Sequence, residues 1–327
     1  MSILDHKAIL VTGGTGSFGK NFIRYLLANT AAKKVIVFSR DELKQSQMAH
    51  EFNDERLRFF IGDVRDLPRL QRAFAGVDIV VHAAALKHVP ILEYNPYEAV
   101  KTNILGSQNV IEAGIDQKVQ KILLVSTDKA VQPINLYGST KLCAEKLFIA
   151  GNSYAAGQTK FSAVRYGNVL GSRGSIVESL LNHNGQDEVK ITDENMTRFW
   201  ITLPQSFSLV MFALEQMAGG EIFVPKIPSM KLVDLFDAVV PEYKRKVIGI
   251  RPGEKMHETL LTEDESRHAY ELEKYYVVLP EFELGRILEE KYKKLGKTLP
   301  LRFRYSSDTN AEWLTKNQLN LLINNKK

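Results

Sequence analysis

Residues 7–19, KAILVTGGTGSFG, decide the fold of this chain. Their apolar first half predicts a buried strand, and the pattern NFIRYLLAN at 21–29 predicts a helix soon after the glycines. Gly13, Gly16 and Gly19 lie between the two at three-residue spacing. Glycines at such a turn let the backbone approach a dinucleotide pyrophosphate, and the helix N-terminus attracts the anion. We therefore expect a dinucleotide-binding unit at the start of the chain.

Strand-like and helix-like segments continue to alternate after this unit. Further strands are predicted at 33–38, 57–63, 77–84, 121–126 and 160–171. This alternation predicts an α/β fold, a Rossmann-type doubly wound parallel sheet. We expect a cofactor-binding domain at 1–165 and a smaller C-terminal domain at 166–327, mainly for substrate, with a segment near 196–218 returning to the first domain. The two would then share chain crossings.

The C-terminal half is less regular. Helices are predicted at 205–217 and 230–240. Residues 247–261, VIGIRPGEKMHETLL, predict a strand, then a loop that carries Arg251 and Glu254, and then a helix. The last 50 residues show weaker patterns, with a short helix expected at the end.

The composition is typical of a globular enzyme. The chain has 327 residues, of which 44% are hydrophobic and 25% charged. The single cysteine, Cys143, excludes an intrachain disulfide and a cysteine-rich metal site, and we expect no metal. No apolar run is long enough to span a membrane and no signal peptide is evident, so we expect a cytoplasmic protein with no membrane partner. The net charge of +5 suits an anionic small substrate. Lys291 and Lys294 lie beside Glu289 and Glu290 in the sequence, a mixture of charges typical of a solvated helix face. We therefore expect no nucleic-acid partner.

The stretch LLVSTDKAVQPINLYGSTK, which ends at Lys141, contains the candidate chemistry. It predicts the end of a buried strand, a polar turn and the start of a helix, on which Tyr137 and Lys141 share one face. An ammonium group beside a phenol favours the phenolate, which would let Tyr137 accept a proton from a hydroxyl near neutral pH. Thr127, Asp128 and Lys129 leave the carboxyl end of the strand, where open α/β sheets bind ligands. The alternative interpretation is a helix cap with some surface charge.

The end of the second strand favours NADP over NAD. An NAD site usually has an acid there for the ribose 2′-hydroxyl, whereas this chain has Ser39 and Arg40, with Lys44 nearby. The guanidinium fork suits a phosphate. Asp41 and Glu42 leave the alternative open that Arg40 pairs with them at the surface.

Other residues are expected at the same edge of the sheet. Asp63 and Val64 follow the third strand and would contact the adenine, and Ala83 is small enough for close backbone approach to the cofactor. Lys87 would reach phosphate or sugar. Asn103 lies in an amphipathic helical pattern and is a candidate internal polar anchor.

Together these motifs resemble extended short-chain dehydrogenase/reductases that act on nucleotide sugars. The finer resemblance is to inverting UDP-N-acetylglucosamine 4,6-dehydratases, which begin pseudaminic acid synthesis. It rests on TGGTGSFG, SRDELKQSQM, IGDVRDLPRL, HAAALKHVPILEYNP, STDKA, PINLYGSTK, RYGNVLGSRGS, MTRFWIT, GGEIFVPKIPSMK and IRPGEK. Related capsule enzymes have Met in place of Tyr137. The resemblance covers nearly the whole chain and fades between about Glu281 and Leu301.

The resemblance implies three sets of site residues. Catalysis would fall to Thr127, Asp128, Lys129 and Tyr137. The residues implied to bind NADP are Gly13, Thr15, Gly16, Ser17, Phe18, Gly19, Ser39, Arg40, Asp41, Lys44, Asp63, Val64, Ala83, Lys87, Lys141 and Val169. The residues implied to bind the substrate are Lys87, Asn168, Ser172, Arg173, Thr197, Arg198, Arg251 and Glu254. The family also implies a homo-oligomer, either a dimer or a hexamer.

The implied reaction is a redox-neutral dehydration of UDP-N-acetylglucosamine with inversion at C5. Tyr137 would take the proton of the 4-hydroxyl, with Thr127 hydrogen-bonded to O4. Lys129 would act as the base at C5, with a pKa lowered by Lys141 and the nicotinamide, and Asp128 would protonate the departing 6-hydroxyl. Two alternatives stay open: a UDP-sugar 4-epimerase, which needs Tyr137 but not the Asp128–Lys129 pair, and a non-catalytic NADP-binding regulator.

Overall fold

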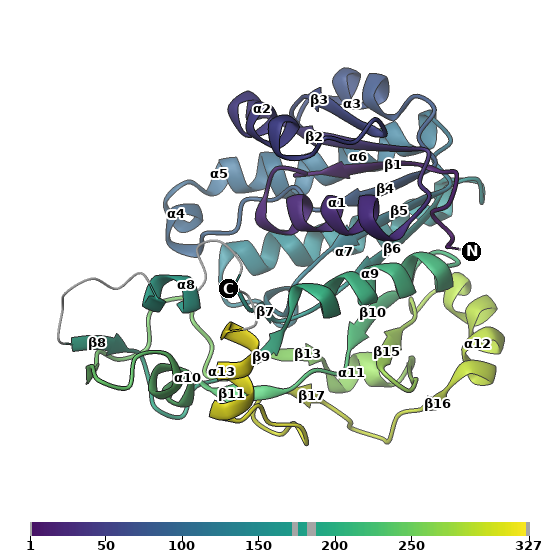
Figure 1. The fold of residues 1–327 in the computed structure, drawn as a ribbon. Coiled ribbons are helices and arrows are strands. Elements are labelled where there is room, and N and C mark those ends of the chain that lie inside the picture. The colour runs from purple at the N-terminus through teal and green to yellow at the C-terminus, as the bar shows by residue number, and fades with distance from the viewer. Residues whose placement is uncertain (1, 172–175, 182–187, 325–327) are drawn as a thin grey trace.

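The computed structural model describes residues 2–171, 176–181 and 188–324 (Figure 1). Its main element is a sheet of ten strands in the order β16-β14-β15-β10-β6-β5-β4-β1-β2-β3. These are β1 (Ala8–Thr12), β2 (Lys34–Ser39), β3 (Leu57–Ile61), β4 (Ile79–His82), β5 (Lys121–Val125), β6 (Lys160–Val164), β10 (Ile222–Pro225), β14 (Ala269–Glu271), β15 (Tyr275–Val278) and β16 (Lys297–Thr298). The strands from β3 across to β10 pair in parallel, while β15, β14 and β16 extend the sheet in antiparallel fashion. The order 3-2-1-4-5-6 is that of a doubly wound dinucleotide-binding sheet, so the predicted fold class is confirmed.

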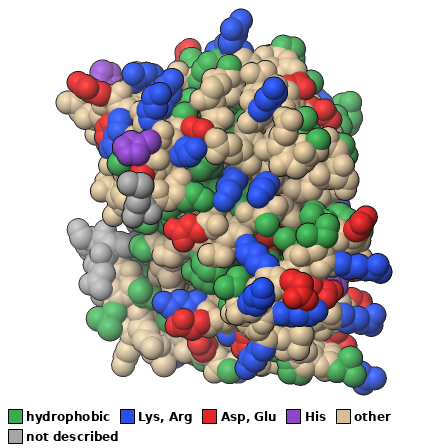
Figure 2. All heavy atoms as spheres, turned by 90° about the vertical axis from the view of Figure 1, so that its right-hand side faces the viewer, with side chains coloured by type: hydrophobic (Ala, Val, Ile, Leu, Met, Phe, Trp, Pro, Cys, Tyr) green, Lys and Arg blue, Asp and Glu red, His purple; other side chains and the backbone are tan. Residues whose placement is uncertain are grey.

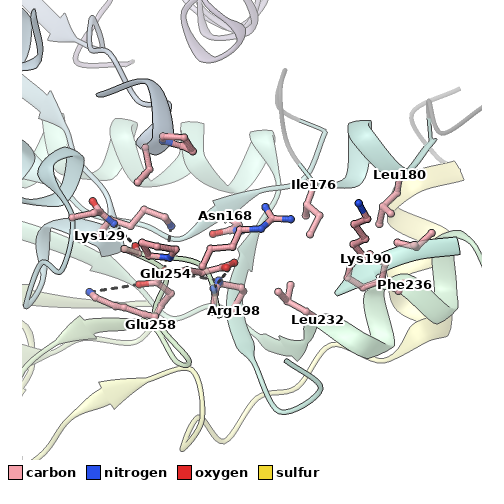
Figure 3. A pocket seen from close by; sticks show the side chains of 18 of the residues that line it. Lys129, Asn168, Ile176, Leu180, Lys190, Arg198, Leu232, Phe236, Glu254 and Glu258 are labelled. Carbon is pink, nitrogen blue, oxygen red and sulfur yellow. Dashed lines mark hydrogen bonds and ion pairs between the residues drawn. The ribbon is translucent and has the colours of Figure 1, made fainter. Parts of the chain in front are cut away.

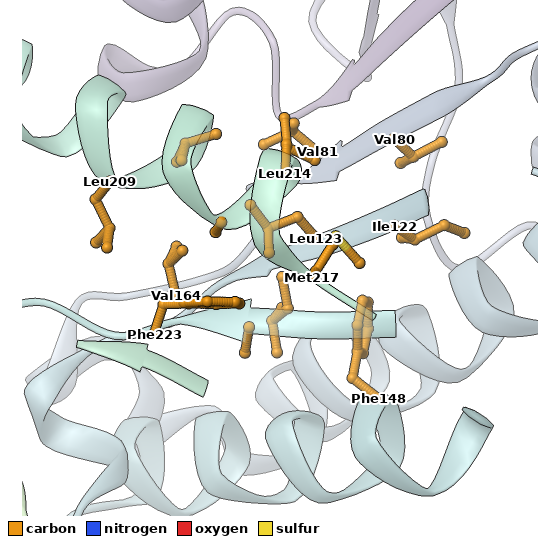
Figure 4. Packing of buried hydrophobic residues seen from close by; sticks show 14 of the residues in the cluster. Val80, Val81, Ile122, Leu123, Phe148, Val164, Leu209, Leu214, Met217 and Phe223 are labelled. Carbon is orange, nitrogen blue, oxygen red and sulfur yellow. The ribbon is translucent and has the colours of Figure 1, made fainter. Parts of the chain in front are cut away.

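Helices cover both faces of this sheet. On one face α1 (Ser17–Asn29) packs beside α9 (Leu203–Gln216), which also lies on β5 and β6. On the opposite face lies α7 (Leu136–Tyr154), and Figure 4 shows Leu209 and Phe148 pointing at the strands from the two sides. The remaining helical elements of the first half are α2 (Glu42–Glu51), α3 (Leu67–Phe74), α4 (Val89–Tyr94), α5 (Pro96–Ala99), a π-helical segment (Val100–Leu105), α6 (Gly106–Asp116) and a 3-10 turn (Asp128–Ala130).

Asn103 is buried in the π-helical segment, as the sequence predicted. Its side chain accepts a hydrogen bond from the Leu86 amide (2.8 Å) and donates to the Leu86 carbonyl (2.9 Å) and to Thr140 Oγ1 (3.0 Å). It thereby joins the loop after β4 to α7, and both segments contribute to the site described below.

A smaller lobe forms beside the carboxyl ends of the parallel strands (Figure 1, lower left). Its sheets are β7 (Asn168–Val169) with β9 (Thr197–Ile201) and β11 (Ser229–Lys231), and β8 (Glu188–Ile191) with β12 (Lys244–Val247). Its helices are α8 (Ile176–Leu181), α10 (Leu232–Val239) and α13 (Lys316–Asn324). A separate apolar cluster that includes Trp200, Met230, Leu235, Phe236 and Leu319 holds this lobe together.

Three details of the predicted secondary structure are wrong. The strand expected to start at Val247 instead ends there, as β12. The strand expected at 160–171 ends at Val164. The helix expected within 247–261 is absent, because β13 (Thr259–Leu261) pairs antiparallel with β17 (Tyr305–Ser306). A partner strand distant in the chain satisfies this backbone, so tertiary pairing outweighs local helical preference.

The last segments are α11 (Glu263–Ser266) and α12 (Glu283–Leu295). On the face that contains α12, Figure 2 shows Lys and Arg side chains interspersed with Asp and Glu, and Lys293 pairs with Glu289 at 3.0 Å. Across the part of the chain that the structure describes, no helix is long and apolar enough to cross a membrane.

Candidate active site

The glycine turn between β1 and α1 forms a close-fitting cradle. Gly13 has φ of +66°, and a Cβ atom there would lie 2.9 Å from the backbone of Ala84. A Cβ atom on Gly19 would lie 2.5 Å from the Gly13 carbonyl oxygen. Only glycine fits at these two positions: Gly13 lies in the turn before α1, and Gly19 lies in the first turn of α1, which starts at Ser17. The residues present therefore fit the pyrophosphate of a nicotinamide dinucleotide.

The ion pairs at the end of β2 differ from those of the alternative interpretation, in which Arg40 pairs with Asp41 and Glu42. Arg40 pairs with Asp63 at 3.5 Å, and no ion pair joins it to Asp41 or Glu42 in the described structure. Asp41 instead caps α2 and pairs with Lys44 at 2.6 Å. The Arg40 side chain is 53% exposed, so its guanidinium has solvent-accessible donors at the expected ribose position.

Tyr137 and Lys141 lie four residues apart on α7 and so share one side of this helix, as predicted. Burial raises the pKa of Tyr137 to about 12, although the positive charge of Lys129 and a hydrogen bond with Thr127 oppose this rise. Burial lowers the pKa of Lys141 to about 8, and its Nζ donates to the carbonyl of Val125 at 2.9 Å. The expectation that Lys141 makes Tyr137 easier to ionise is therefore wrong. Burial has the largest effect on the pKa of Tyr137 and raises it, and the cation that opposes this rise is Lys129 rather than Lys141.

The turn after β5 brings Thr127, Asp128 and Lys129 together. Asp128 is fully buried, and its Oδ1 accepts hydrogen bonds from Thr127 Oγ1 (2.8 Å) and Lys129 Nζ (3.1 Å). Lys129 Nζ also lies 3.4 Å from Oε1 of Glu258. Burial alone would lower the pKa of Lys129, but the two carboxylates outweigh it and raise the pKa above the ordinary value. The predicted lowering is wrong because Asp128, the larger influence, and Glu258 both face the Lys129 amine and favour its charged form.

A cavity of about 560 Å³ opens beside this turn. Figure 3 shows two different ends: Lys129, Arg198, Glu254 and Glu258 form a charged end, whereas the other end is mainly apolar. The residues labelled at that apolar end are Ile176, Leu180, Leu232 and Phe236, with Lys190 beside them. The cavity therefore offers polar groups to one part of a ligand and an apolar surface to another.

Several residues predicted to bind substrate line this cavity, namely Asn168, Arg198, Arg251 and Glu254. Thr197 is not among the described lining residues; its hydroxyl contacts His257 Nδ1 (2.8 Å) and Ser307 Oγ (2.7 Å). Ser172 and Arg173 lie outside the described residues. Burial lowers the pKa of Lys87, which interacts electrostatically with Glu178 of α8 and with Lys129 of the turn after β5.

The other residues predicted to bind the cofactor lie on several different elements. Ser39 ends β2 and accepts a hydrogen bond from Gln45 Nε2 (3.0 Å), and Val64 packs under α6 against Gly106. The Ala83 amide donates to the Thr12 carbonyl (3.3 Å), at the close approach of Gly13. Val169 pairs with Ile201 in the smaller lobe.

Sequence reasoning missed three residues of the site. Asn135 caps α7 through its Oδ1, which accepts from the Gly138 amide at 2.8 Å, and it also lines the cavity. Lys255 and Glu258 line the charged end. An asparagine just before a helix was a readable capping signal. The other two lay in a segment wrongly predicted to be helical.

The sheet order, the glycine turn and the Tyr137–Lys141 pair define an extended short-chain dehydrogenase/reductase, a class that uses a nicotinamide cofactor. The profile of the family described as "Polysaccharide biosynthesis protein" matches residues 9–280. The chain belongs to this family.

Curated relatives and solved structures agree with this placement. A protein of Campylobacter jejuni named "UDP-N-acetylglucosamine 4,6-dehydratase (inverting)" is 49% identical over 334 residues, which cover 98% of each chain. A "UDP-glucose 4-epimerase" of Rickettsia felis is 42% identical and covers 83% of this chain and 82% of its own. The structure of Pen from Bacillus thuringiensis matches with a TM-score of 0.89 at 38% identity over 99% of each chain. The dTDP-glucose 4,6-dehydratase DesIV from Streptomyces venezuelae, at 23% identity and a TM-score of 0.68 over 76% of this chain and 86% of its own, shows the shared fold.

Proposed function

We propose that this protein is an inverting UDP-N-acetylglucosamine 4,6-dehydratase, a hydro-lyase. The product would be UDP-2-acetamido-2,6-dideoxy-β-L-arabino-hex-4-ulose. The observation that carries the proposal is the group formed by Tyr137, the buried Asp128 and the partly buried Lys129 beside a two-ended cavity. An epimerase needs a proton acceptor at the 4-hydroxyl, but it has no use for an acid and a base at C6 and C5. The full-length relative with the dehydratase name supports the same choice.

In this proposal each side chain handles one proton. Tyr137 accepts the proton of the 4-hydroxyl, and Thr127, which is hydrogen-bonded to Tyr137, holds O4. The resulting 4-ketone acidifies the proton at C5, which Lys129 removes after passing the proton of its own ammonium to Asp128. Asp128 gives a proton to the 6-oxygen, which leaves as water. A bound nicotinamide supplies reversible hydride transfer, so that C4 is oxidised and C6 is reduced.

We propose that the cofactor is NADP, held by residues 1–165, and that residues 166–327 bind mainly the UDP-sugar. Arg40 supports NADP, because its donors are exposed at the end of β2. Arg251 supports the binding of a diphosphate here, because it lines the cavity and no carboxylate among the described residues pairs with it. The apolar end would then accept the uracil ring. We also propose a cytoplasmic homo-oligomer, dimer or hexamer, that supplies pseudaminic acid or a related surface sugar.

Incubation of the purified protein with UDP-N-acetylglucosamine and NADP tests the activity. A product lighter by one water supports the dehydratase, and its NMR spectrum in D₂O reports the configuration and deuterium content at C5. An isomer of unchanged mass would identify the 4-epimerase, the activity named for the rickettsial relative. Unchanged substrate would favour a binding protein and would refute both enzymes.

A further inference from the structure

Glu258 lies at the charged end of the cavity with a firmly held backbone. Its amide donates to Ser307 Oγ (2.9 Å), and its carbonyl accepts from the Ser307 amide (2.8 Å). The side chain is only 3% exposed. Because β13 and β17 fix this backbone position, the carboxylate is aimed at the turn after β5 from the opposite wall of the site.

The carboxylate contacts three cations at the charged end. Its Oε1 is 3.4 Å from Lys129 Nζ and 3.9 Å from Arg198 Nε, and its Oε2 is 3.7 Å from Lys255 Nζ. Oε2 nevertheless has no hydrogen-bond partner among the described residues. A buried carboxylate oxygen without a donor is costly, so such an atom calls for a functional explanation.

Glu254 provides a useful contrast four residues earlier. It also lines the cavity and also has an unpartnered buried oxygen, Oε2. Its ion pair, however, is with Arg198 at 3.6 Å, and no ion pair joins it to Lys129 among the residues described. Of these two cavity carboxylates, Glu258 is therefore the one positioned to act on Lys129.

We infer that Glu258 is a positioning residue for Lys129, orienting its amine toward C5 and stabilising the ammonium that forms when the C5 proton arrives. The inference rests on the proposed dehydration. In that step the Lys129 ammonium first passes a proton to the Asp128 carboxylate; the C5–H bond then breaks, its proton goes to the free amine of Lys129, and its electron pair enters the enolate of the 4-ketone. Asp128 is uncharged until it gives its proton to the departing oxygen, so it cannot act as the anion that holds Lys129 throughout the step. Glu258 is the second anion that keeps the amine in place.

The charge on Lys129 depends on groups from several elements. Facing it are Asp128 from its own turn, Glu258 and Lys255 from the segment before β13, Arg198 from β9, Lys87 from the loop after β4, and Tyr137 from α7. Removal of the Glu258 charge takes away one of the two anions that favour the ammonium form. The pKa of Lys129 should therefore fall in Glu258→Gln.

The test compares Glu258→Gln with Glu254→Gln in the complete enzyme with NADP and UDP-N-acetylglucosamine. For Glu258→Gln we expect C5 exchange with D₂O to slow by about 10²-fold, the cost of a misplaced catalytic group. The absorbance of reduced nicotinamide, which reports C4 oxidation, should stay close to native. The alkaline rise in C5 exchange should also move to lower pH. For Glu254→Gln we expect a raised KM for the UDP-sugar, with neither the slower C5 exchange nor the shift of its pH dependence.

Two further variants keep the inference falsifiable. In a Lys129→Ala background, Glu258→Gln should cause no further loss, because the carboxylate acts through the lysine. If Glu258→Gln fails to fold, Glu258→Asp, which keeps the charge on a shorter side chain, should still slow C5 exchange. C5 exchange at the native rate in whichever Glu258 variant folds would overturn the inference. So would a loss of C5 exchange on Glu258→Gln that is as large in the Lys129→Ala background as in the native enzyme. Failure of the native enzyme to release water would instead refute the proposed function.

Discussion

Asn135 Nδ2 donates a hydrogen bond of 2.8 Å to the carbonyl oxygen of Gly253, although 118 residues separate them in the chain. The same side chain caps α7 through its Oδ1. Gly253 has φ of +75° and belongs to the loop that carries Arg251 and Glu254. One amide thus ties the helix of Tyr137 to the loop that carries Arg251 and Glu254 into the cavity wall.

This double role can be separated by substitution. Asn135→Asp keeps a good helix cap but faces the Gly253 carbonyl with an acceptor, so we expect near-native stability and a KM for the UDP-sugar raised several-fold. Asn135→Ala loses both contacts and should lower the free energy of unfolding by about 1 kcal/mol. Denaturant titration and steady-state kinetics measure the two effects. A native KM in Asn135→Asp would contradict the role of the tie.

Arg40 should distinguish the two nicotinamide cofactors. A hydrogen bond to a charged group contributes roughly 1.5–3 kcal/mol, so Arg40→Ala should weaken NADP binding about tenfold or more and NAD binding little. Lys44→Ala is the matched control, because Lys44 is already paired with Asp41 and should matter less. Titration calorimetry with both cofactors measures this. Equal losses for NADP and NAD would refute the assignment.

Arg251 should bind the diphosphate of the substrate. Its forked donors suit phosphate oxygens, so Arg251→Ala should raise the KM for the UDP-sugar far more than it changes NADP affinity. Arg245→Ala serves as the control, since Arg245 pairs with Asp237 at 2.9 Å and does not line the cavity. If calorimetry shows that Arg251→Ala binds UDP as tightly as the native protein, the assignment is wrong.

Lys129 should separate oxidation from elimination. Tyr137 remains in Lys129→Ala, so we expect some bound 4-keto sugar and reduced nicotinamide to form. Loss of a general base typically costs about 10²–10⁴ in rate, so water loss and C5 deuterium uptake should fall by that factor. Absorbance and NMR follow the two steps. Native exchange at C5 in this variant would place the base elsewhere, with Tyr137 the next candidate.

Lys141 should make stability depend on pH. Burial lowers its pKa to about 8 in the folded protein from an ordinary value of 10.5. Between these values the unfolded chain binds more protons than the folded one, so the free energy of unfolding should rise with pH relative to Lys141→Met. The rise is at most roughly 3 kcal/mol across the window. Denaturant unfolding of both proteins at several pH values measures this rise. If the difference in free energy of unfolding between the two proteins stays the same at every pH, the pKa of Lys141 is not lowered by burial.

The local elements could be predicted from sequence because their causes are local. The apolar run of β1, the glycines behind it and the start of α1 lie within one short segment, and backbone sterics dictate that turn. Likewise Tyr137 and Lys141 share a face of α7 because helical geometry requires it.

Tertiary structure alone decided the electrostatics of the site. The sequence predicted a lowered pKa for Lys129, but the folded chain brings two carboxylates to its amine, Asp128 from its own turn and Glu258 from the segment before β13, and together they raise the pKa. That segment was itself predicted to be helical, whereas β13 pairs with β17. A charge acts through distance and burial rather than through position in the chain. The sequence by itself therefore determined the fold class and which groups carry the candidate chemistry, while the folded chain determined which charges meet and in what protonation state.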